Sequence, residues 1–264
     1  MVIPTVLLLT LGALGTSGLN IVIPPVHDVS TIVDDYLAFI EPIMRARGDT
    51  EIEIDGINDA QISVHGHHLI KHHLKLADHP KLQELLKDPS IPIPFSLSCE
   101  KGKLGDISTL KRVGPASEKL WHFSGEDSIT LTAQYTLKTM YAKYPKCKIY
   151  LANVPYKGQI TLRAPHSNFT TTLDLFSRKK ECYFTDYSTH FNDKTLELKT
   201  TVKGTPYNKL FEQLIDYLIK KNPNDVRNKA NDRLSFALAA SARKHKGCLF
   251  LDNSIRQHVK NKHQ

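Results

Sequence analysis

Two hydrophobic periods alternate along this chain, and the first to appear is helical. Apolar side chains recur every three or four residues after a short proline-containing stretch, which places them on one face of a helix. The members of this stripe are Val29, Val33, Tyr36, Leu37, Ile40, Ile43 and Met44. Asp28 or Ser30 can cap its start, and Gly48 is a typical stop. The pattern predicts an amphipathic helix of about five turns.

Between Lys103 and Val202 the period changes to two, as it does in half-buried strands. The clearest alternating runs are Ile129–Leu137, Ile160–Ala164, Phe169–Leu175 and Leu196–Thr200. Residues with turn preference separate most of the runs, so we expect short connections and an antiparallel meander with one apolar face. The weaker pattern of Ile52, Ile54, Ile57, Ile62 and Val64 predicts a short hairpin before it. A short helix is expected near Lys81–Leu86.

Helical spacing returns at the C-terminal end, with start signals at Thr205-Pro206 and again at Asn222-Pro223. We expect one long helix there, kinked or broken at Pro223. The predicted fold class is therefore α+β: a curved antiparallel sheet wrapped around a long C-terminal helix, with an N-terminal amphipathic helix. The 264 residues, 41% hydrophobic and 23% charged, have an ordinary globular composition.

The N-terminal residues predict a secreted protein. The apolar run from Val2 to Leu14 is too short to span a bilayer comfortably, and small residues at Thr16 and Gly18 suit a signal-peptidase site. We therefore expect a signal peptide at residues 1–18, a single lipid-binding-type domain at 19–247 and a basic tail at 248–264. A buried N-terminal helix is the alternative.

The net charge of +8 comes from the C-terminal segment. Lys220 to Gln264 carry 11 basic and 3 acidic residues, whereas residues 1–219 carry 24 of each sign. The neutral charge of residues 1–219 argues against a nucleic-acid-binding body, so we expect no nucleic-acid partner. The basic segment is either a solubilising surface or an attachment site for anionic membranes or glycans.

The cysteines and one triplet fit the secretory pathway. Cys99, Cys147, Cys182 and Cys248 form no CxxC pair, and an even count in a secreted chain predicts two disulfides. Three pairings are open; we favour Cys147–Cys182 with Cys99–Cys248, because Cys147 and Cys182 both lie at predicted strand starts. Asn168-Phe169-Thr170 is an acceptor triplet for N-glycosylation at Asn168.

The sequence contains few motifs that indicate catalysis. GxSxG, HExxH, P-loop and GxGxxG motifs are all absent, so we expect no enzyme activity and no cofactor. Six histidines lie close together in the chain: His65, His67, His68, His72, His73 and His79. His68 and His72 have the spacing of two metal ligands on a helix, but we favour a polar loop or edge and expect no metal site.

A ten-residue segment resembles a known family. Gly105-Asp106-Ile107-Ser108-Thr109-Leu110-Lys111-Arg112-Val113-Gly114 is similar to a segment of the group-7 mite allergens and of the arthropod juvenile-hormone-binding and takeout proteins, and the order of elements over roughly residues 27–245 also matches. The resemblance implies the fold of lipopolysaccharide-binding and bactericidal permeability-increasing proteins, with a lipid or terpenoid between sheet and helix. The chain departs from the family in its cysteine positions, its histidine-rich segment and its basic tail.

From the pattern and the resemblance together we predict a secreted, non-enzymatic binder of a lipid, fatty acid or terpenoid. Ten side chains are expected to face its apolar interior: Tyr36, Ile40, Ile43, Ile129, Leu131, Leu173, Leu175, Phe211, Leu214 and Leu218. Period alone leaves open whether that interior is a ligand tunnel or a filled core. The alternatives are a surface protein that recognises anionic glycans or bacterial lipid without a tunnel, and a secreted enzyme on an unfamiliar scaffold.

Overall fold

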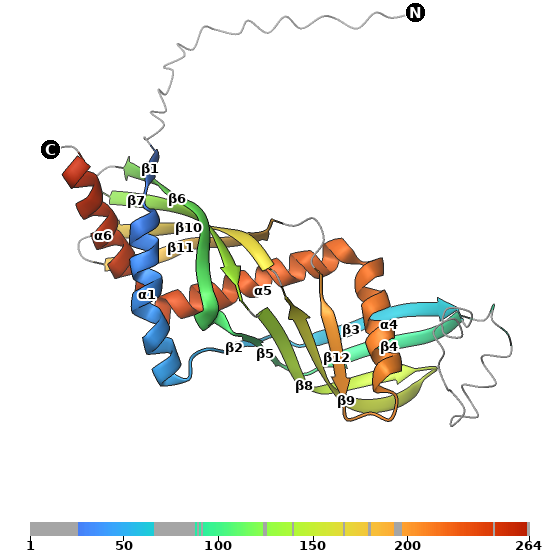
Figure 1. The fold of residues 1–264 in the computed structure, drawn as a ribbon. Helices are drawn as coiled ribbons and strands as arrows, with labels where there is room; N and C mark the ends of the chain where they lie inside the picture. Colours follow the sequence, from blue (N-terminus) through green and yellow to red (C-terminus); the bar gives the residue numbers. More distant parts are fainter. Residues whose placement is uncertain are drawn as a thin grey trace, which may run out of the picture.

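The computed structural model describes residues 26–65, 88, 90, 92–123, 126–138, 140–165, 167–178, 181–192, 197–244 and 246–262. These form a mixed α/β protein with two large antiparallel sheets and, within the described ranges, four helices (Figure 1). The helices are α1 (Ser30–Arg47), α4 (Asn208–Lys221), α5 (Pro223–Lys244) and α6 (Gly247–Lys262). A short 3-10 turn covers Ile107–Thr109.

One sheet has five strands in the order β1-β6-β7-β10-β11. Its strands are β1 (Val26–Asp28), β6 (Leu110–Phe123), β7 (Glu126–Leu137), β10 (Ser167–Arg178) and β11 (Glu181–Phe191). From Ile129 to Leu137 on β7 and from Ser167 to Leu175 on β10 the odd-numbered residues are buried, because successive side chains of a strand point to opposite faces. The buried face of this sheet packs against α1, α5 and α6.

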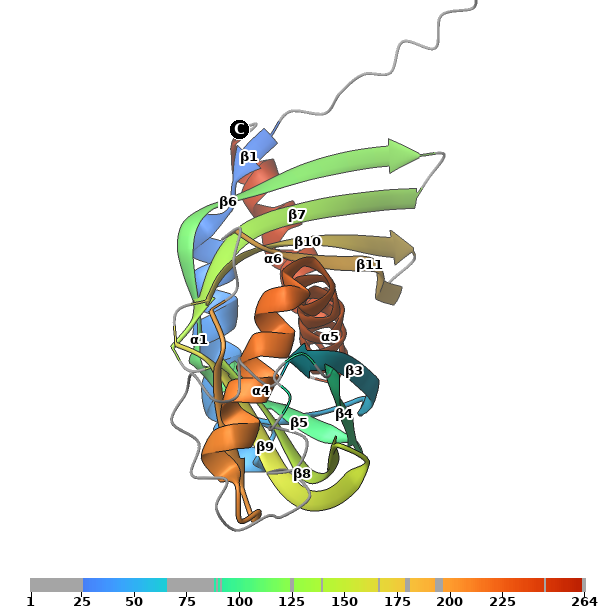
Figure 2. The ribbon, with the colours of Figure 1, turned by 90° about the vertical axis from the view of Figure 1, so that its right-hand side faces the viewer.

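The other sheet has seven strands, with β12-β9-β8-β4-β3 in sequence and β2 paired to β5, which also pairs with β8. Its strands are β2 (Ile52–Ile54), β3 (Ile57–His65), β4 (Pro92–Cys99), β5 (Gly102–Gly105), β8 (Met140–Leu151), β9 (Val154–Ala164) and β12 (Lys199–Lys203). Figures 1 and 2 show the two sheets at opposite ends of the molecule. The expected hairpin of β2 with β3 is wrong, since β2 pairs with β5 and β3 with β4.

The predicted antiparallel strands are present, but they do not form one meander. The chain leaves the five-stranded sheet after β7, forms the β8–β9 hairpin in the other sheet, and returns at β10. Three consecutive hairpins, β6–β7, β8–β9 and β10–β11, therefore alternate between the sheets. Alternation of apolar residues fixes which face of a strand is buried, but it does not say which sheet the strand joins.

The predicted amphipathic helix is confirmed as α1, and it ends at Gly48 as the sequence predicts. Gly48 adopts the left-handed conformation (φ 68°) without steric cost, because it has no Cβ, and it ends the helix there. The Asp28 carboxylate accepts the backbone N–H of Ser30 at 2.9 Å, and the Ser30 hydroxyl accepts the N–H of Ala116 at 2.9 Å. The second bond, together with the bond from the Val29 N–H to the Ala116 carbonyl oxygen at 3.0 Å, attaches the start of α1 to β6.

The Gly105–Gly114 segment is a structural junction. Asp106 accepts hydrogen bonds from the backbone and hydroxyl of Ser108, which closes the 3-10 turn before β6. Arg112 then binds Asp34 on α1 with two hydrogen bonds, of 2.9 Å from Nε and 2.6 Å from Nη2. A bidentate arginine–carboxylate pair fixes the relative orientation of both groups. The segment therefore fastens α1 across the five-stranded sheet.

The two disulfides are present, but the favoured pairing is wrong. Cys99 bonds to Cys147, and Cys182 bonds to Cys248. Cys147 lies within β8 rather than at its start, directly opposite Cys99 of β4 in the sheet register. Cys182 is on β11 in the other sheet, so a Cys147–Cys182 bond would have to join strands that do not neighbour each other.

The C-terminal helical region consists of three separate helices, with the break between α4 and α5 at Asn222. Within the basic segment 248–264, residues up to Lys262 belong to α6, which packs against α1, β10 and β11 and buries Cys248, Leu251 and Ile255. Arg256 of α6 forms ion pairs with Asp127 and Asp252. None of the helices in the described ranges combines the length and the apolar character that crossing a bilayer requires.

Several sequence predictions fall on residues that the structure leaves undescribed. The predicted signal peptide (1–18), the helix near Lys81–Leu86 and the histidines from His67 to His79 lie outside the described residues. His65 ends β3. Asn168 is exposed on β10, and the hydroxyl of Thr170, the third residue of its triplet, donates to Asn192 at 2.7 Å. Glycosylation of Asn168 stays a prediction.

Candidate ligand cavity

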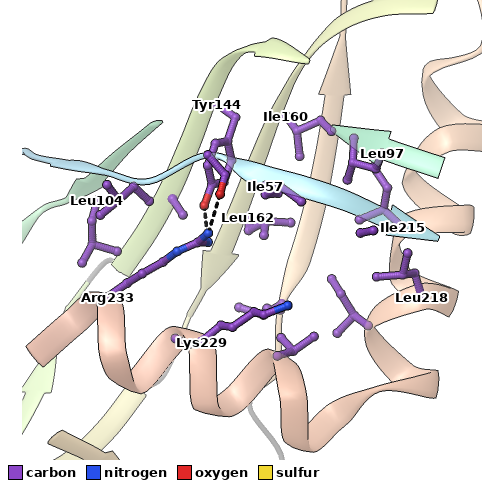
Figure 3. A pocket seen from close by; sticks show the side chains of 18 of the residues that line it. Ile57, Leu97, Leu104, Tyr144, Ile160, Leu162, Ile215, Leu218, Lys229 and Arg233 are labelled. Carbon is purple, nitrogen blue, oxygen red and sulfur yellow. Dashed lines mark hydrogen bonds between the residues drawn. The ribbon is translucent and has the colours of Figure 1, made fainter. Parts of the chain in front are cut away.

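An apolar cavity of about 280 Å³ lies between the seven-stranded sheet and helices α4 and α5. Figure 3 shows side chains from both helices and from several strands converging on this space. The β8–β9 hairpin supplies the strand wall: the register pairs Met140 with Ala164, Ala142 with Leu162 and Tyr144 with Ile160, and all six residues line the cavity. Residues two apart on a strand share a face, so the hairpin presents a continuous apolar surface.

Helix α4 forms a second wall. Ile215, Leu218 and Ile219 line the cavity at the three- and four-residue spacing of a single helix face. Near the start of α4, Phe211 is fully buried against the rings of Tyr156 and Tyr207 and anchors this end of the helix. Glu212 and Asp216 attach the helix to β12 by accepting hydrogen bonds from the Val202 backbone and the Thr200 hydroxyl.

Helix α5 closes the cavity with a face of mixed character. Val226, Lys229, Ala230 and Arg233 recur at the spacing of one helix face, and all four line the cavity. Lys229 forms an ion pair with Asp225 at 2.9 Å, and both side chains are more than 60% exposed. This pair therefore lies at the solvent edge of the cavity, while Arg233 is half-buried one turn farther along the helix.

Arg233 and Tyr144 form a polar corner in the otherwise apolar lining. The Arg233 guanidinium donates one hydrogen bond to the Tyr144 hydroxyl and another, of 2.9 Å, to the carbonyl oxygen of Gly56. Its central carbon lies 5.8 Å from the centre of the Tyr144 ring, within cation–π range. Burial raises the pKa of Tyr144 above its ordinary value, against the opposing effect of Arg233. The phenol therefore stays neutral near pH 7 and can accept the arginine N–H.

A second, much smaller cavity of about 50 Å³ lies between α1, the five-stranded sheet and the C-terminal half of α5. Four of the residues expected to face an apolar interior line it: Tyr36, Ile40, Leu131 and Leu173. This volume is far below the roughly 300–1,000 Å³ of common ligand sites. These four side chains therefore belong mainly to the core between α1 and the five-stranded sheet.

The other expected interior residues are divided between the large cavity and the core. Leu218 lines the large cavity. Ile129, Leu175, Phe211 and Leu214 are buried in the core cluster, and Ile43 is half-buried on α1. The ten side chains thus lie at three places in the molecule, and the structure brings four of them together around the small cavity.

Sequence reasoning missed the two cations of the large cavity. The sequence pattern after Pro223 indicates Val226 and Ala230 as part of the apolar side of a helix, and it assigns no role to Lys229 and Arg233. The signal was available, because residues 226, 229, 230 and 233 share one helix face. In the part of the chain that the structure describes, no group of three or more histidine, cysteine or carboxylate side chains has the arrangement of a metal site.

Together the fold and the cavity define a class: a mixed α/β protein with two antiparallel sheets and an apolar cavity under two helices. No family model and no curated protein matches the sequence. A solved structure entitled "Crystal structure of lipopolysaccharide binding protein" aligns with 84% of this chain and 40% of its own, at 11% identity and a TM-score of 0.44. The chain thus spans less than half the length of that protein. The likeness to mite allergens and takeout proteins remains a resemblance of the Gly105–Gly114 segment.

Proposed function

We propose that this protein is a secreted, non-enzymatic binder of a hydrophobic ligand, which it holds in the cavity between the seven-stranded sheet and helices α4 and α5. The observation that carries the proposal is the 280 Å³ of apolar-lined space at this position. Its apolar lining distinguishes this space, because the pockets of about 440 Å³ beside β11 and about 390 Å³ beside β3 and β4 are lined by many polar side chains. In this proposal the curved sheets wrap around α5, which forms one wall of the binding site.

The size of the cavity suits one slender apolar chain. An engineered apolar cavity of about 150 Å³ already binds small apolar molecules, and ligand sites commonly measure about 300–1,000 Å³. Each methylene group that moves from water into the cavity contributes about 0.8 kcal/mol. A flexible chain of several methylenes therefore gains enough to bind, provided that the helices allow it to enter.

Secretion and the lack of catalysis belong to the same proposal. Two disulfides suit an oxidising compartment and support an extracellular location. Carriage of a hydrophobic molecule needs only burial and a route of entry, so the proposal contains no chemical step. Tyr144 and Arg233 then serve as binding and structural groups.

A cavity-filling variant tests the proposal. Ala230 and Ala142 line the cavity from opposite walls, so Ala230→Phe or Ala142→Leu should occupy part of its volume. We expect either change to weaken the saturable binding of an uncharged long-chain fluorescent probe by about tenfold, the loss of some 1.4 kcal/mol. Asn228→Leu, on the exposed side of the same helix, is the matched control and should bind as the parent does. If folded Ala230→Phe and Ala142→Leu variants bind the probe as well as the parent, the proposed site is wrong.

A further inference from the structure

The cations of α5 lie in an unexpected place for a packed interior. Two of the four α5 side chains on the cavity-facing stripe are charged, and charged side chains are rarely buried without a partner. Lys229 is paired with Asp225, and Arg233 is bonded to Tyr144 and Gly56. Figure 3 shows Arg233 and Lys229 extending from α5 into the space between the helix and the strands, with Arg233 reaching Tyr144. Their alkyl stems contribute to the apolar wall. The ammonium of Lys229 lies at the solvent edge, and the guanidinium of Arg233 is half-buried beside Tyr144.

Arg233 is held in place but keeps donors to offer. Its two hydrogen bonds, to the Tyr144 hydroxyl and the Gly56 carbonyl, use two of the five N–H donors of a guanidinium. Tyr144 is fully buried, so it provides a fixed support that orients the guanidinium plane. An arginine positioned in this way can bind a carboxylate in bidentate geometry without first losing side-chain freedom.

The charge balance around the cavity favours an anion. Among the described lining residues, Lys229 and Arg233 are the two cations and Asp225 is the one carboxylate. Asp225 is engaged with Lys229 in an exposed i,i+4 pair, a kind of pair that contributes little stability and exchanges readily. The described lining residues therefore carry a net charge of +1, and the Asp55 carboxylate lies outside the lining, close enough to raise the pKa of Tyr144.

Resting on the proposed function, we infer that the ligand is a single-chain fatty acid, whose carboxylate binds Arg233 and Lys229 at the edge of the cavity while its chain extends along α4 and the β8–β9 hairpin. The apolar wall accounts for the chain, and the oriented guanidinium accounts for the headgroup. The cavity volume suits one chain better than the two acyl chains of a membrane phospholipid.

The test compares palmitic acid with hexadecanol, which has the same chain without the charge. By isothermal titration from a cyclodextrin carrier, we expect the parent protein to bind the acid at least about tenfold more tightly than the alcohol, the size expected of a charge-assisted hydrogen bond. Arg233→Gln should remove this preference and leave the affinity for hexadecanol within about threefold of the parent. Arg233→Lys, which keeps the charge but loses the planar fork, should retain part of it.

Lys229→Gln provides a second readout that does not depend on Arg233. Because Lys229 is largely exposed, this variant should fold normally, and it should reduce the affinity for the acid by about threefold. Lys221→Gln, an exposed cation at the end of α4 outside the cavity lining, is the matched control and should change nothing. An unchanged acid-to-alcohol ratio in the folded Lys229 and Arg233 variants would overturn the inference.

The outcomes for the inference and for the proposed function are distinguishable. Equal affinity of the parent for acid and alcohol refutes the headgroup site and leaves the apolar cavity as a binding site. Failure to bind either compound refutes both.

Discussion

Gly56 lines the large cavity, and the close packing around it leaves no room for a side chain. A Cβ built at this position would lie 2.2 Å from the backbone carbonyl oxygen of Cys99, far inside van der Waals contact. The close approach brings the turn between β2 and β3 against the end of β4, where the Gly56 carbonyl accepts its hydrogen bond from Arg233. One glycine therefore sets both the packing of the turn and the position of the arginine.

We expect Gly56→Ala to lower the free energy of unfolding by about 1–3 kcal/mol, the usual cost of forcing extra atoms into a packed site. The obstacle is backbone rather than a flexible side chain, so a rotamer change cannot relieve it. Gly48→Asn is the control, because Gly48 has open space around its Cβ position and asparagine tolerates a φ of 68°. Urea denaturation measures both variants, and an unchanged midpoint for Gly56→Ala would contradict the close contact.

At the scale of elements, the two disulfides have different roles. Cys99–Cys147 joins neighbouring strands that the β4–β8 ladder already holds together. Cys182–Cys248 joins β11 to the start of α6, which has no ladder to hold it. Other attachments of α6 include the buried side chains of Leu251 and Ile255, the packing of the Phe250 ring on α1, the Ser177–Asp252 hydrogen bond and the Arg256–Asp127 ion pair.

Removing the Cys182–Cys248 bond with paired serine substitutions should therefore affect α6 more than any other element. We expect a loss of about 2–4 kcal/mol in the free energy of unfolding and faster amide exchange throughout α6. The matched variant without Cys99–Cys147 should lose stability but keep slow exchange in α6. Protection of α6 that is equal in the two variants would show that the disulfide does not anchor the helix.

The elements were predictable to different degrees. Helix α1 and its end at Gly48 follow from local spacing and one residue type, and so do the alternating strands. The division into two sheets could not be predicted, because the Ile129–Leu137 and Ile160–Ala164 runs alternate in the same way and yet join different sheets. The disulfide pairing depends on that division, which is why the favoured pairing of Cys147 with Cys182 failed.

At the scale of the whole molecule, α5 connects the two sheets. Its first turns line the large cavity beside the seven-stranded sheet, and its last turns pack against β11 and α6. Of the ten predicted interior residues, seven lie on α1 and the five-stranded sheet and three on α4, and Leu218 alone of the ten lines the large cavity. A sequence pattern identifies apolar faces, but the volume left between them depends on how all the walls meet.

The basic C-terminal segment is largely helical, and some of its cations form ion pairs with the rest of the protein. Lys244 forms an ion pair with Asp49 at 2.6 Å, and Arg256 is paired with two carboxylates, so part of the positive charge is compensated within the fold. Recognition of an anionic membrane or glycan by this segment stays a prediction. Because α6 contributes to the core, charge substitutions at exposed positions test it more cleanly than a truncation would.

Native mass spectrometry tests the central claim, that the large cavity binds one apolar chain, most directly. With palmitic acid in excess, the parent should form a one-to-one complex that organic extraction removes, and folded Ala230→Phe should form much less of it because its side chain occupies the cavity. Asn228→Leu should match the parent. If the parent takes up no fatty acid, or if Ala230→Phe takes up as much as the parent, the cavity is not the binding site.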